Sequence, residues 1–197
     1  MWIKICGMTT PEALEAAVGA GADAVGFVFA ESVRRVSAQR AAVLAEAVRG
    51  KMRCVAVTRH PGQNEIDEIL AVLRPDVLQS DAADLERLRL PQQLERLPVL
   101  RGAGGALPPR VLFEGTVSGV GQTCDWSAAA EAARRSELVL AGGLDPVNVA
   151  AAIAAVRPFG VDVSSGVEAR PGLKDPLAIE RFVKAARMGC AAVQEPT

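Results

Sequence analysis

The sequence has little of the chemistry that histidine, tyrosine and cysteine usually supply. It contains one histidine, His60, no tyrosine, and four widely separated cysteines, Cys6, Cys54, Cys124 and Cys190. A zinc site would need ligands to converge from distant parts of the chain, so no metal site is expected. Only His60 could serve a Ser-His-Asp arrangement, and no G-x-S-x-G elbow accompanies it. Acid–base chemistry should therefore fall mainly to carboxylates, cysteine or lysine.

The sequence also lacks an excess of charge of either sign and any long apolar run. Its 22 lysines and arginines balance 23 aspartates and glutamates, with no dense basic run, so no nucleic-acid partner is expected. No apolar stretch reaches the roughly 18 residues of a membrane span. The N-terminal segment Met1–Lys4 runs directly into a strand-like pattern, unlike a signal peptide. We expect a cytoplasmic protein with no membrane partner.

The length and composition suit one domain with a sizeable core. The chain has 197 residues, of which 50% are hydrophobic and 23% charged, which is typical of a globular domain. We expect residues 1–197 to form a single domain that is monomeric rather than homodimeric. Residues 190–197 are expected to be a flexible tail.

Eight short apolar segments are predicted to be β-strands. Most are continuously apolar rather than alternating, which is typical of parallel strands covered on both faces. They are Trp2–Cys6, Ala24–Phe29, Cys54–Thr58, Val77–Gln79, Pro98–Arg101, Val111–Glu114, Leu138–Ala141 and Val161–Val163.

Helical patterns separate most of these strands. Apolar residues recur at helical spacing in segments 66–73 and 179–186. A capping residue followed by proline is typical of a helix start, and it occurs at Thr10-Pro11, Asp145-Pro146 and Asp175-Pro176. Between the fifth and sixth strands, Gly102–Arg110 is rich in Gly and Pro and too short for a full helix, so we expect a loop there. The fold class is therefore α/β, a single small (β/α)8 TIM barrel with one helix replaced by a loop. A doubly wound open sheet is the alternative, and it would usually carry a Gly-rich first loop.

Small residues follow the seventh and eighth strands, where barrels commonly bind phosphate. They are Gly142 and Gly143 after the seventh strand, and Ser164, Ser165 and Gly166 after the eighth. Glycine lets backbone amides approach an anion, and serine adds hydroxyl donors. Glycines also simply turn the chain at strand ends, but two adjacent loops of this kind favour a phosphate site.

Three further residue types at strand ends have both a functional and a structural interpretation. Cys6 ends the first strand and is either a buried apolar thiol or a general base. Asp125 is either the cap of the following helix or an acid facing Cys6 across the barrel mouth. Arg34 and Arg35 follow the second strand and are either solvated charges or, for one of them, a ligand of an anionic substrate.

Several motifs resemble one family nearly end to end, from Lys4 to about Gly189. They are K-I-C-G-M-T, G-A-D-A-V-G-F-V-F, G-x-G-x-T-x-D-W, L-A-G-G-L-D-P-x-N-V and V-D-V-S-S-G-V-E-x-x-P-G-x-K-D. In these motifs the chain resembles phosphoribosylanthranilate isomerase, the barrel enzyme of tryptophan biosynthesis. The resemblance implies an Amadori rearrangement of N-(5-phosphoribosyl)anthranilate to the carboxyphenylamino-deoxyribulose phosphate.

The resemblance also implies roles for individual residues. Cys6 matches the family's general base, Asp125 its general acid, and Arg34 its substrate-binding arginine. Asp162 is expected to contact substrate as well, and Gly121 to join the phosphate-binding residues. The implied partner is a small phosphorylated sugar–anthranilate substrate, and the implied chemistry uses no metal or organic cofactor.

The chain departs from the family pattern mainly in its middle. Leu78–Asp81 stands where Q-L-H-G is usual, Thr58–His60 stands where F-V-N is usual, and Ser118 and Cys124 replace a Gly and a Phe. Two other functions remain open. One is a sister sugar-phosphate isomerase of histidine biosynthesis that works with two aspartates, against which Cys6 argues. The other is a degenerate barrel that binds a phosphorylated ligand without catalysis.

Overall fold

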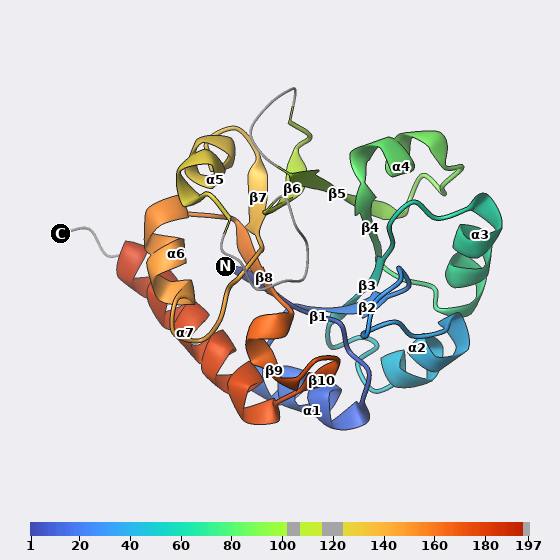
Figure 1. Cartoon of the computed structure of the whole chain (residues 1–197), viewed down its shortest axis with the longest axis horizontal. Coiled ribbons are helices and arrows are strands. Elements are labelled where there is room, and N and C mark those ends of the chain that lie inside the picture. Colours follow the sequence, from blue (N-terminus) through green and yellow to red (C-terminus); the bar gives the residue numbers. More distant parts are fainter. Residues whose placement is uncertain (102–106, 116–123, 195–197) are drawn as a thin grey trace.

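The computed structural model describes residues 1–101, 107–115 and 124–194, in which eight parallel strands close into a barrel in chain order (Figure 1). The strands are β1 (Trp2–Cys6), β2 (Ala24–Val28), β3 (Arg53–Val57), β4 (Val77–Asp81), β5 (Glu95–Arg101), β6 (Arg110–Glu114), β7 (Glu137–Leu140) and β8 (Gly160–Val163). All eight predicted strands are present, with ends shifted by at most three residues. The TIM-barrel prediction is confirmed, and an open sheet is wrong because β1 pairs with both β2 and β8.

Helices surround the barrel and shield the outer faces of its strands (Figure 1). They are α1 (Pro11–Ala20), α2 (Ala38–Ala45), α3 (Gln63–Val72), α4 (Ala82–Arg87), α5 (Trp126–Ala133), α6 (Val149–Val156) and α7 (Pro176–Gln194). The part of the β5–β6 connection that the structure describes, residues 107–109, contains no helix, consistent with the predicted loop. Residues 190–194 continue α7, so the prediction of a flexible tail from residue 190 needs correction.

The structure has a core on each side of the strand wall. Outside the wall, helices bury the two predicted stripes, including Ile66, Ile69, Phe182 and Val183. Inside the barrel, aliphatic side chains from alternate strand positions pack together, namely Ala24, Val55, Val77, Leu97, Val99, Leu112, Val139 and Ala141. Burying a side chain of valine or leucine size contributes about 1.5–3 kcal/mol, so this interior is a packed floor rather than a channel.

A small hairpin after β8 joins three loops at the C-terminal end of the barrel. Following a 3-10 turn at Ser165–Val167, β9 (Glu168–Arg170) pairs antiparallel with β10 (Leu173–Lys174). At its turn, Gly172 has φ 82°, and a Cβ there would lie 2.7 Å from the carbonyl oxygen of Val33. Thr9 Oγ1 also donates to the Gly172 carbonyl at 2.9 Å. The hairpin therefore fixes the loops after β1 and β2 relative to β8.

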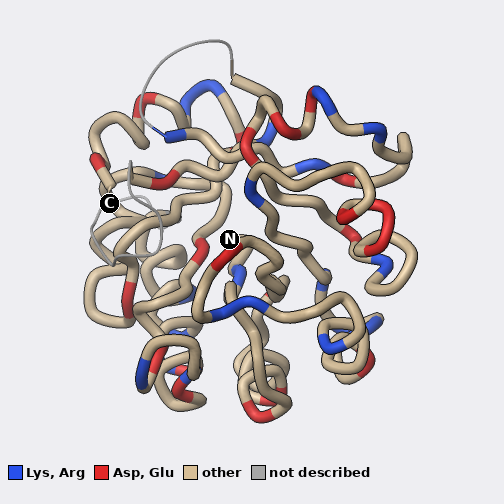
Figure 2. The backbone as a smooth tube through the Cα atoms, turned by 45° about the vertical axis from the view of Figure 1, so that its right-hand side comes forward, with Lys and Arg blue, Asp and Glu red and all other residues tan. Residues whose placement is uncertain are grey.

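Charged residues of both signs are distributed over the chain (Figure 2). Many form ion pairs, such as the pairs that Arg110 makes with Glu95 and Glu137. Among the residues that the structure describes, no helix combines the length and apolar character needed to cross a membrane.

Candidate active site

A buried ion pair lies beside the thiol of Cys6 inside the barrel. Lys4 and Cys6 are two residues apart on β1, so their side chains share one face of the strand. Lys4 Nζ donates to Asp162 Oδ1 at 2.7 Å, and β1 and β8 pair in the register that sets these two residues opposite each other. Gly26 on β2 leaves room for the pair, because a Cβ there would lie 3.0 Å from Cys6 Sγ and 3.2 Å from Lys4 Cε.

The electrostatics of this cluster raise both pKa values, which favours the neutral form of Cys6 and the charged form of Lys4. Burial raises the pKa of the Cys6 thiol above its usual value, while the ammonium groups of Lys4 and Lys174 offset part of that rise. Burial also acts to lower the pKa of Lys4, but Asp162 and Cys6 outweigh it, so the pKa of Lys4 is raised. Lys4 therefore stays charged at neutral pH, next to the position where a Cys6 thiolate would form.

Arg34 is held against a second buried charge cluster. Its Nε donates to Glu168 Oε1 at 2.7 Å and its Nη2 donates to Glu168 Oε2 at 2.9 Å. Lys174 Nζ donates to Glu168 Oε1 at 2.8 Å and to the Ser164 carbonyl at 2.9 Å. Arg35, in contrast, is exposed. The loop after β2 thus turns the first of the two arginines inward and the second to solvent.

The loops after β7 and β8, which were predicted to bind phosphate, touch each other. Gly166 lies so close to the β7 loop that a Cβ on it would be 2.0 Å from the carbonyl oxygen of Leu144. Ser164 Oγ donates to the Cys6 carbonyl at 3.1 Å, which joins the β8 loop to the end of β1. Ser165 begins the 3-10 turn that follows. Only glycine fits at position 166, and the two loops form one continuous surface.

Gly142 and Gly143 adopt backbone conformations that favour glycine, with φ values of 91° and 63°. Within the described part of the chain, their amides donate no hydrogen bond, so both can serve an anion. The predicted Gly121 lies outside the described residues. The helix expected to begin near Asp145 begins instead at Val149, because Asp145 Oδ1 accepts the amides of Val147 and Asn148 in a turn.

Asp125 caps α5. Its Oδ1 accepts the amides of Ser127 at 2.9 Å and Ala128 at 3.1 Å, and the residue is exposed. None of these contacts joins Asp125 to the cluster around Cys6. The cap that the sequence allowed is therefore present, and the acid role stays a prediction from the family resemblance.

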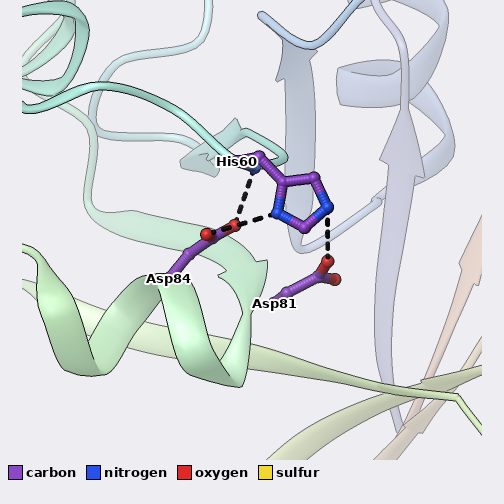
Figure 3. Close-up of side chains that lie close together, drawn as sticks. All are labelled: His60, Asp81 and Asp84. Carbon is purple, nitrogen blue, oxygen red and sulfur yellow. Dashed lines mark hydrogen bonds and ion pairs between the residues drawn. The ribbon is translucent and has the colours of Figure 1, made fainter.

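Two of the segments that depart from the family pattern meet in one network (Figure 3). The imidazole of His60 lies between two carboxylates, with Nδ1 3.5 Å from Asp84 Oδ1 and Nε2 3.9 Å from Asp81 Oδ2. These residues have the spacing of metal ligands, with the ligand atoms all within 4.8 Å of one another. Arg87, however, donates to Asp84, and Arg101 donates to Asp81. Because each carboxylate already has a cationic partner, the arrangement favours an ion-pair network over a cation site.

Gln79 presents a buried acceptor toward the barrel interior. It lies two residues after Val77, which packs in the interior cluster, so both side chains share that face. In the part of the chain that the structure describes, Gln79 Oε1 has no hydrogen-bond partner. Buried polar atoms are normally paired, so a substrate hydroxyl is a suitable donor for it.

The structure brings together most of the predicted site and adds residues that the sequence analysis missed. Cys6, Arg34 and Asp162 lie at one end of the barrel with the β7 and β8 loops. The missed residues are Lys4, Glu168, Lys174 and Gln79. Lys4 could have been found from its i, i+2 relation to Cys6, whereas Glu168 and Lys174 required the pairing of β9 with β10.

Comparisons with known proteins agree with one another. A family model described as N-(5'phosphoribosyl)anthranilate (PRA) isomerase matches residues 3–185. The N-(5'-phosphoribosyl)anthranilate isomerase of Rhizobium rhizogenes is 37% identical over 210 residues, which cover 95% of each chain. One similar solved structure is a phosphoribosyl anthranilate isomerase in complex with reduced 1-(o-carboxyphenylamino)-1-deoxyribulose 5-phosphate. Its sequence is 32% identical and its TM-score is 0.76, and the match covers 95% of this chain and 99% of that one. Monomers generated from the dimeric enzyme of Thermotoga maritima are 31% identical with a TM-score of 0.79, at the same coverage.

Proposed function

Because the chain belongs to the N-(5'-phosphoribosyl)anthranilate isomerase family, we propose that Cys6 and Asp125 perform the proton transfers of that isomerisation. The protein is an isomerase of tryptophan biosynthesis. The proposed reaction is the Amadori rearrangement of N-(5-phosphoribosyl)anthranilate to 1-(2-carboxyphenylamino)-1-deoxyribulose 5-phosphate. It needs one acid, one base and sites for two anionic groups of the substrate.

The acid step opens the sugar ring. Asp125 donates a proton to the furanose ring oxygen, the bond from that oxygen to C1 breaks, and the nitrogen lone pair forms a C1=N double bond, giving an iminium ion that keeps the N–H of the anthranilate nitrogen. The amides of Ser127 and Ala128 donate to Asp125 Oδ1 and hold the side chain at the start of α5.

The base step moves a proton from carbon. The Cys6 thiolate removes the C2 proton of the iminium ion, giving a neutral enolamine that tautomerises to the ketone of the product. The observation that carries this proposal is the ammonium group of Lys4 beside Cys6 in the barrel interior. This buried positive charge offsets part of the effect of burial and of the Asp162 carboxylate, both of which disfavour the Cys6 thiolate.

The remaining predicted residues bind the substrate. Gly142, Gly143, Ser164, Ser165 and Gly166 hold the phosphate through amides and hydroxyls, together with Gly121, which lies outside the described residues. Arg34 holds the anthranilate carboxylate through paired hydrogen bonds. Asp162 and Gln79 face the barrel interior, where the sugar hydroxyls must lie.

The experiment that tests the function follows the fluorescence of phosphoribosylanthranilate mixed with the purified chain. If the chain is an isomerase, the signal decays at a rate proportional to enzyme concentration, and the product has the mass of the substrate. A signal that only shifts would identify the degenerate barrel that binds without turnover. Activity on the substrate of the sister isomerase of histidine biosynthesis, without decay of this signal, would also contradict the proposal.

We also propose that the protein is a cytoplasmic monomer. All four cysteines are free thiols, which agrees with a reducing compartment. Light scattering on the purified chain should give the mass of one chain, and twice that mass would contradict the monomer.

A further inference from the structure

The guanidinium group of Arg34 uses only one of its edges in the structure. Its Nε and Nη2 form a two-point pair with the Glu168 carboxylate, at 2.7 and 2.9 Å. Within the described residues, Nη1 donates no hydrogen bond. A guanidinium group has five N–H donors in a rigid plane, so the edge formed by Nη1 and Nη2 can still receive a second carboxylate.

Glu168 is itself fixed from the opposite side. Lys174 lies directly across the β9–β10 hairpin from it, and its ammonium donates to Glu168 Oε1 at 2.8 Å. The other two donors of Lys174 go to the carbonyl and the hydroxyl oxygen of Ser164, at 2.9 and 3.2 Å. The side chains of Glu168 and Lys174 are 5% and 0% exposed, so water does not compete strongly for these bonds. Arg34 is thus linked through two buried residues to the loop proposed to bind phosphate.

The backbone around the pair leaves Arg34 little freedom to move. A Cβ on Gly7 would lie 2.7 Å from Arg34 Cδ, so the arginine stem rests directly on the backbone after β1. The hairpin turn at Gly172 rests on the carbonyl of Val33, the residue before Arg34. Contacts from β1, β2 and the hairpin therefore hold both partners of the pair in place.

We propose that Glu168 is a positioning residue that orients Arg34, so that its free edge receives the carboxylate of the anthranilate ring. This inference rests on the proposed function and assigns a role to a residue that does not itself touch the substrate. The covalent structure of a substrate limits the distance between its phosphate and its carboxylate. An arginine tied to the phosphate loop through Glu168 and Lys174 is set at a fixed distance from that loop, which selects substrates of the matching length.

The charge of Glu168 alone and a positioning role of Glu168 predict opposite changes in substrate affinity for the Glu168→Gln variant. This difference makes the inference testable. Glu168 is negative, so replacing it by neutral Gln leaves more positive charge near Arg34 and would tighten the binding of an anionic substrate. The Gln amide, however, has one acceptor oxygen and an NH2 group that cannot accept from Nη2. Glu168→Gln therefore breaks the two-point hold on Arg34 while it keeps the size of the side chain. If Glu168 positions Arg34, substrate binding weakens.

The experiment is a double-mutant cycle read by steady-state kinetics on phosphoribosylanthranilate. We expect Glu168→Gln to lower kcat/KM by about tenfold or more, mainly through a higher KM, because a displaced binding group loses most of its contact. In an Arg34→Met background, the same change should alter kcat/KM by less than about twofold, because there is no arginine left to orient. Glu180→Gln is the matched control, since Glu180 is an exposed glutamate on α7 and should leave kinetics unchanged in both backgrounds.

A second variant covers the case in which Glu168→Gln does not fold. Glu168→Asp keeps the charge beside Lys174 and withdraws the carboxylate from Arg34 by one methylene. It should raise KM in the wild-type background and leave it unchanged with Arg34→Met. The melting temperature of each variant is measured alongside, because a purely structural role would lower stability and reduce activity by the same factor in both backgrounds.

The outcomes separate this inference from the function on which it rests. If the wild-type chain does not turn over phosphoribosylanthranilate, the proposed function fails and this inference with it. If the wild type is active but the Glu168 variants match it, the positioning role alone is wrong. The positioning role is also wrong if the Glu168 variants lower kcat/KM by the same factor with and without Arg34→Met. It is equally wrong if Glu168→Gln lowers KM, as charge alone predicts.

Discussion

Lys4 Nζ and Asp162 Oδ1 form a 2.7 Å ion pair in the barrel interior, and the Lys4 side chain is fully buried. Removing one partner of a buried pair leaves an uncompensated charge and typically costs about 3–5 kcal/mol. Substituting Lys4 or Asp162 singly would therefore confuse loss of catalysis with loss of folding. The tests below use residues whose replacement leaves this pair intact.

Replacing the proposed base or the proposed acid should abolish most turnover. We expect Cys6→Ala and Asp125→Asn each to lower kcat by about a hundredfold or more, the usual scale for a lost general base or acid. KM should change little. Asparagine is a good helix cap, so Asp125→Asn preserves the start of α5. Turnover close to wild type in either variant, measured by the decay of substrate fluorescence, would remove that residue from its role.

The pH dependence should separate the two roles. In the wild type, the proposed reaction needs both a proton donated by Asp125 and a thiolate at Cys6. In Asp125→Asn only the Cys6 titration remains, and burial raises the pKa of that thiol. The residual kcat/KM of this variant should therefore rise roughly tenfold per pH unit through neutral pH. A residual activity that is flat or falls with pH would argue against a Cys6 thiolate as base.

Replacing the two neighbouring arginines, Arg34 and Arg35, should have very different effects on kcat/KM. Arg34→Met should lower kcat/KM by about a hundredfold, because methionine cannot hold a carboxylate, whereas Arg35→Met should stay within about threefold of wild type. The half-buried Arg34 pairs with Glu168, and Arg35 is exposed. Steady-state kinetics on both variants decides the matter. If Arg35→Met has the larger effect on kcat/KM, the family alignment must shift by one residue. If both variants stay close to wild type, neither arginine binds the substrate.

Inorganic phosphate should stabilise the folded chain through the loops after β7 and β8. Ligand that binds only the folded state raises Tm by mass action. Gly143→Leu should abolish this rise, because its side chain obstructs the proposed site. Gly21→Leu is the matched control. Gly21 also has positive φ, 78° against 63° for Gly143, and an added Cβ there meets nothing within 4 Å. Both variants carry backbone strain, but only the Gly21→Leu control should keep the increase in Tm caused by phosphate. If Gly143→Leu also keeps this increase, the anion binds elsewhere.

The His60 network should contribute stability that is lost in acid. Burial acts to raise the pKa of Asp84, but hydrogen bonds from the His60 amide, Ser80 and Arg87 outweigh it, so the pKa is lowered in the folded state. A carboxylate whose pKa is lower when folded stabilises the protein above its unfolded pKa of about 3.9. That stabilisation disappears as pH falls through the folded value. Asp84→Asn should lower Tm by about 5 °C at pH 7 and flatten the fall in Tm between pH 5 and 3. If Tm falls equally with decreasing pH in the wild type and in Asp84→Asn, protonation of Asp84 does not contribute to acid unfolding.

The sequence predicts the barrel well because buried parallel strands leave a direct pattern. A strand covered on both faces is apolar throughout, so segments such as Val161–Val163 are found within three residues of their observed ends. Of the three helix starts predicted from a capping residue followed by proline, those at Pro11 and Pro176 are confirmed and the third is wrong. The Asp145-Pro146 pair looks like a cap, yet Asp145 and Asn148 exchange hydrogen bonds in a turn that delays α6 to Val149.

The site could be predicted only where its residues stand at strand ends. Cys6 and Arg34 each follow or end a strand, and Gly142 follows another, so parallel topology alone brings them to one face. Glu168 and Lys174 contact each other because of the register of a short hairpin, which no periodicity reveals. The contact between His60 and Asp81 could not be predicted from the family motifs either, because both residues lie in segments that depart from the family pattern.

The closure of the barrel between β1 and β8 has a kinetic consequence. Lys4 and Asp162 are 158 residues apart, and Arg34 and Glu168 are 134 apart, so both pairs are among the most non-local contacts of the chain. Contacts of such separation form late in folding, because the entropy of closing a long loop is lost before the contact forms. A chain that has formed only its first strands holds Lys4 and Arg34 without their ionic partners Asp162 and Glu168. Activity should therefore appear last during refolding, after helical signals have recovered, and a chain emerging from the ribosome remains inert until its final quarter has been made.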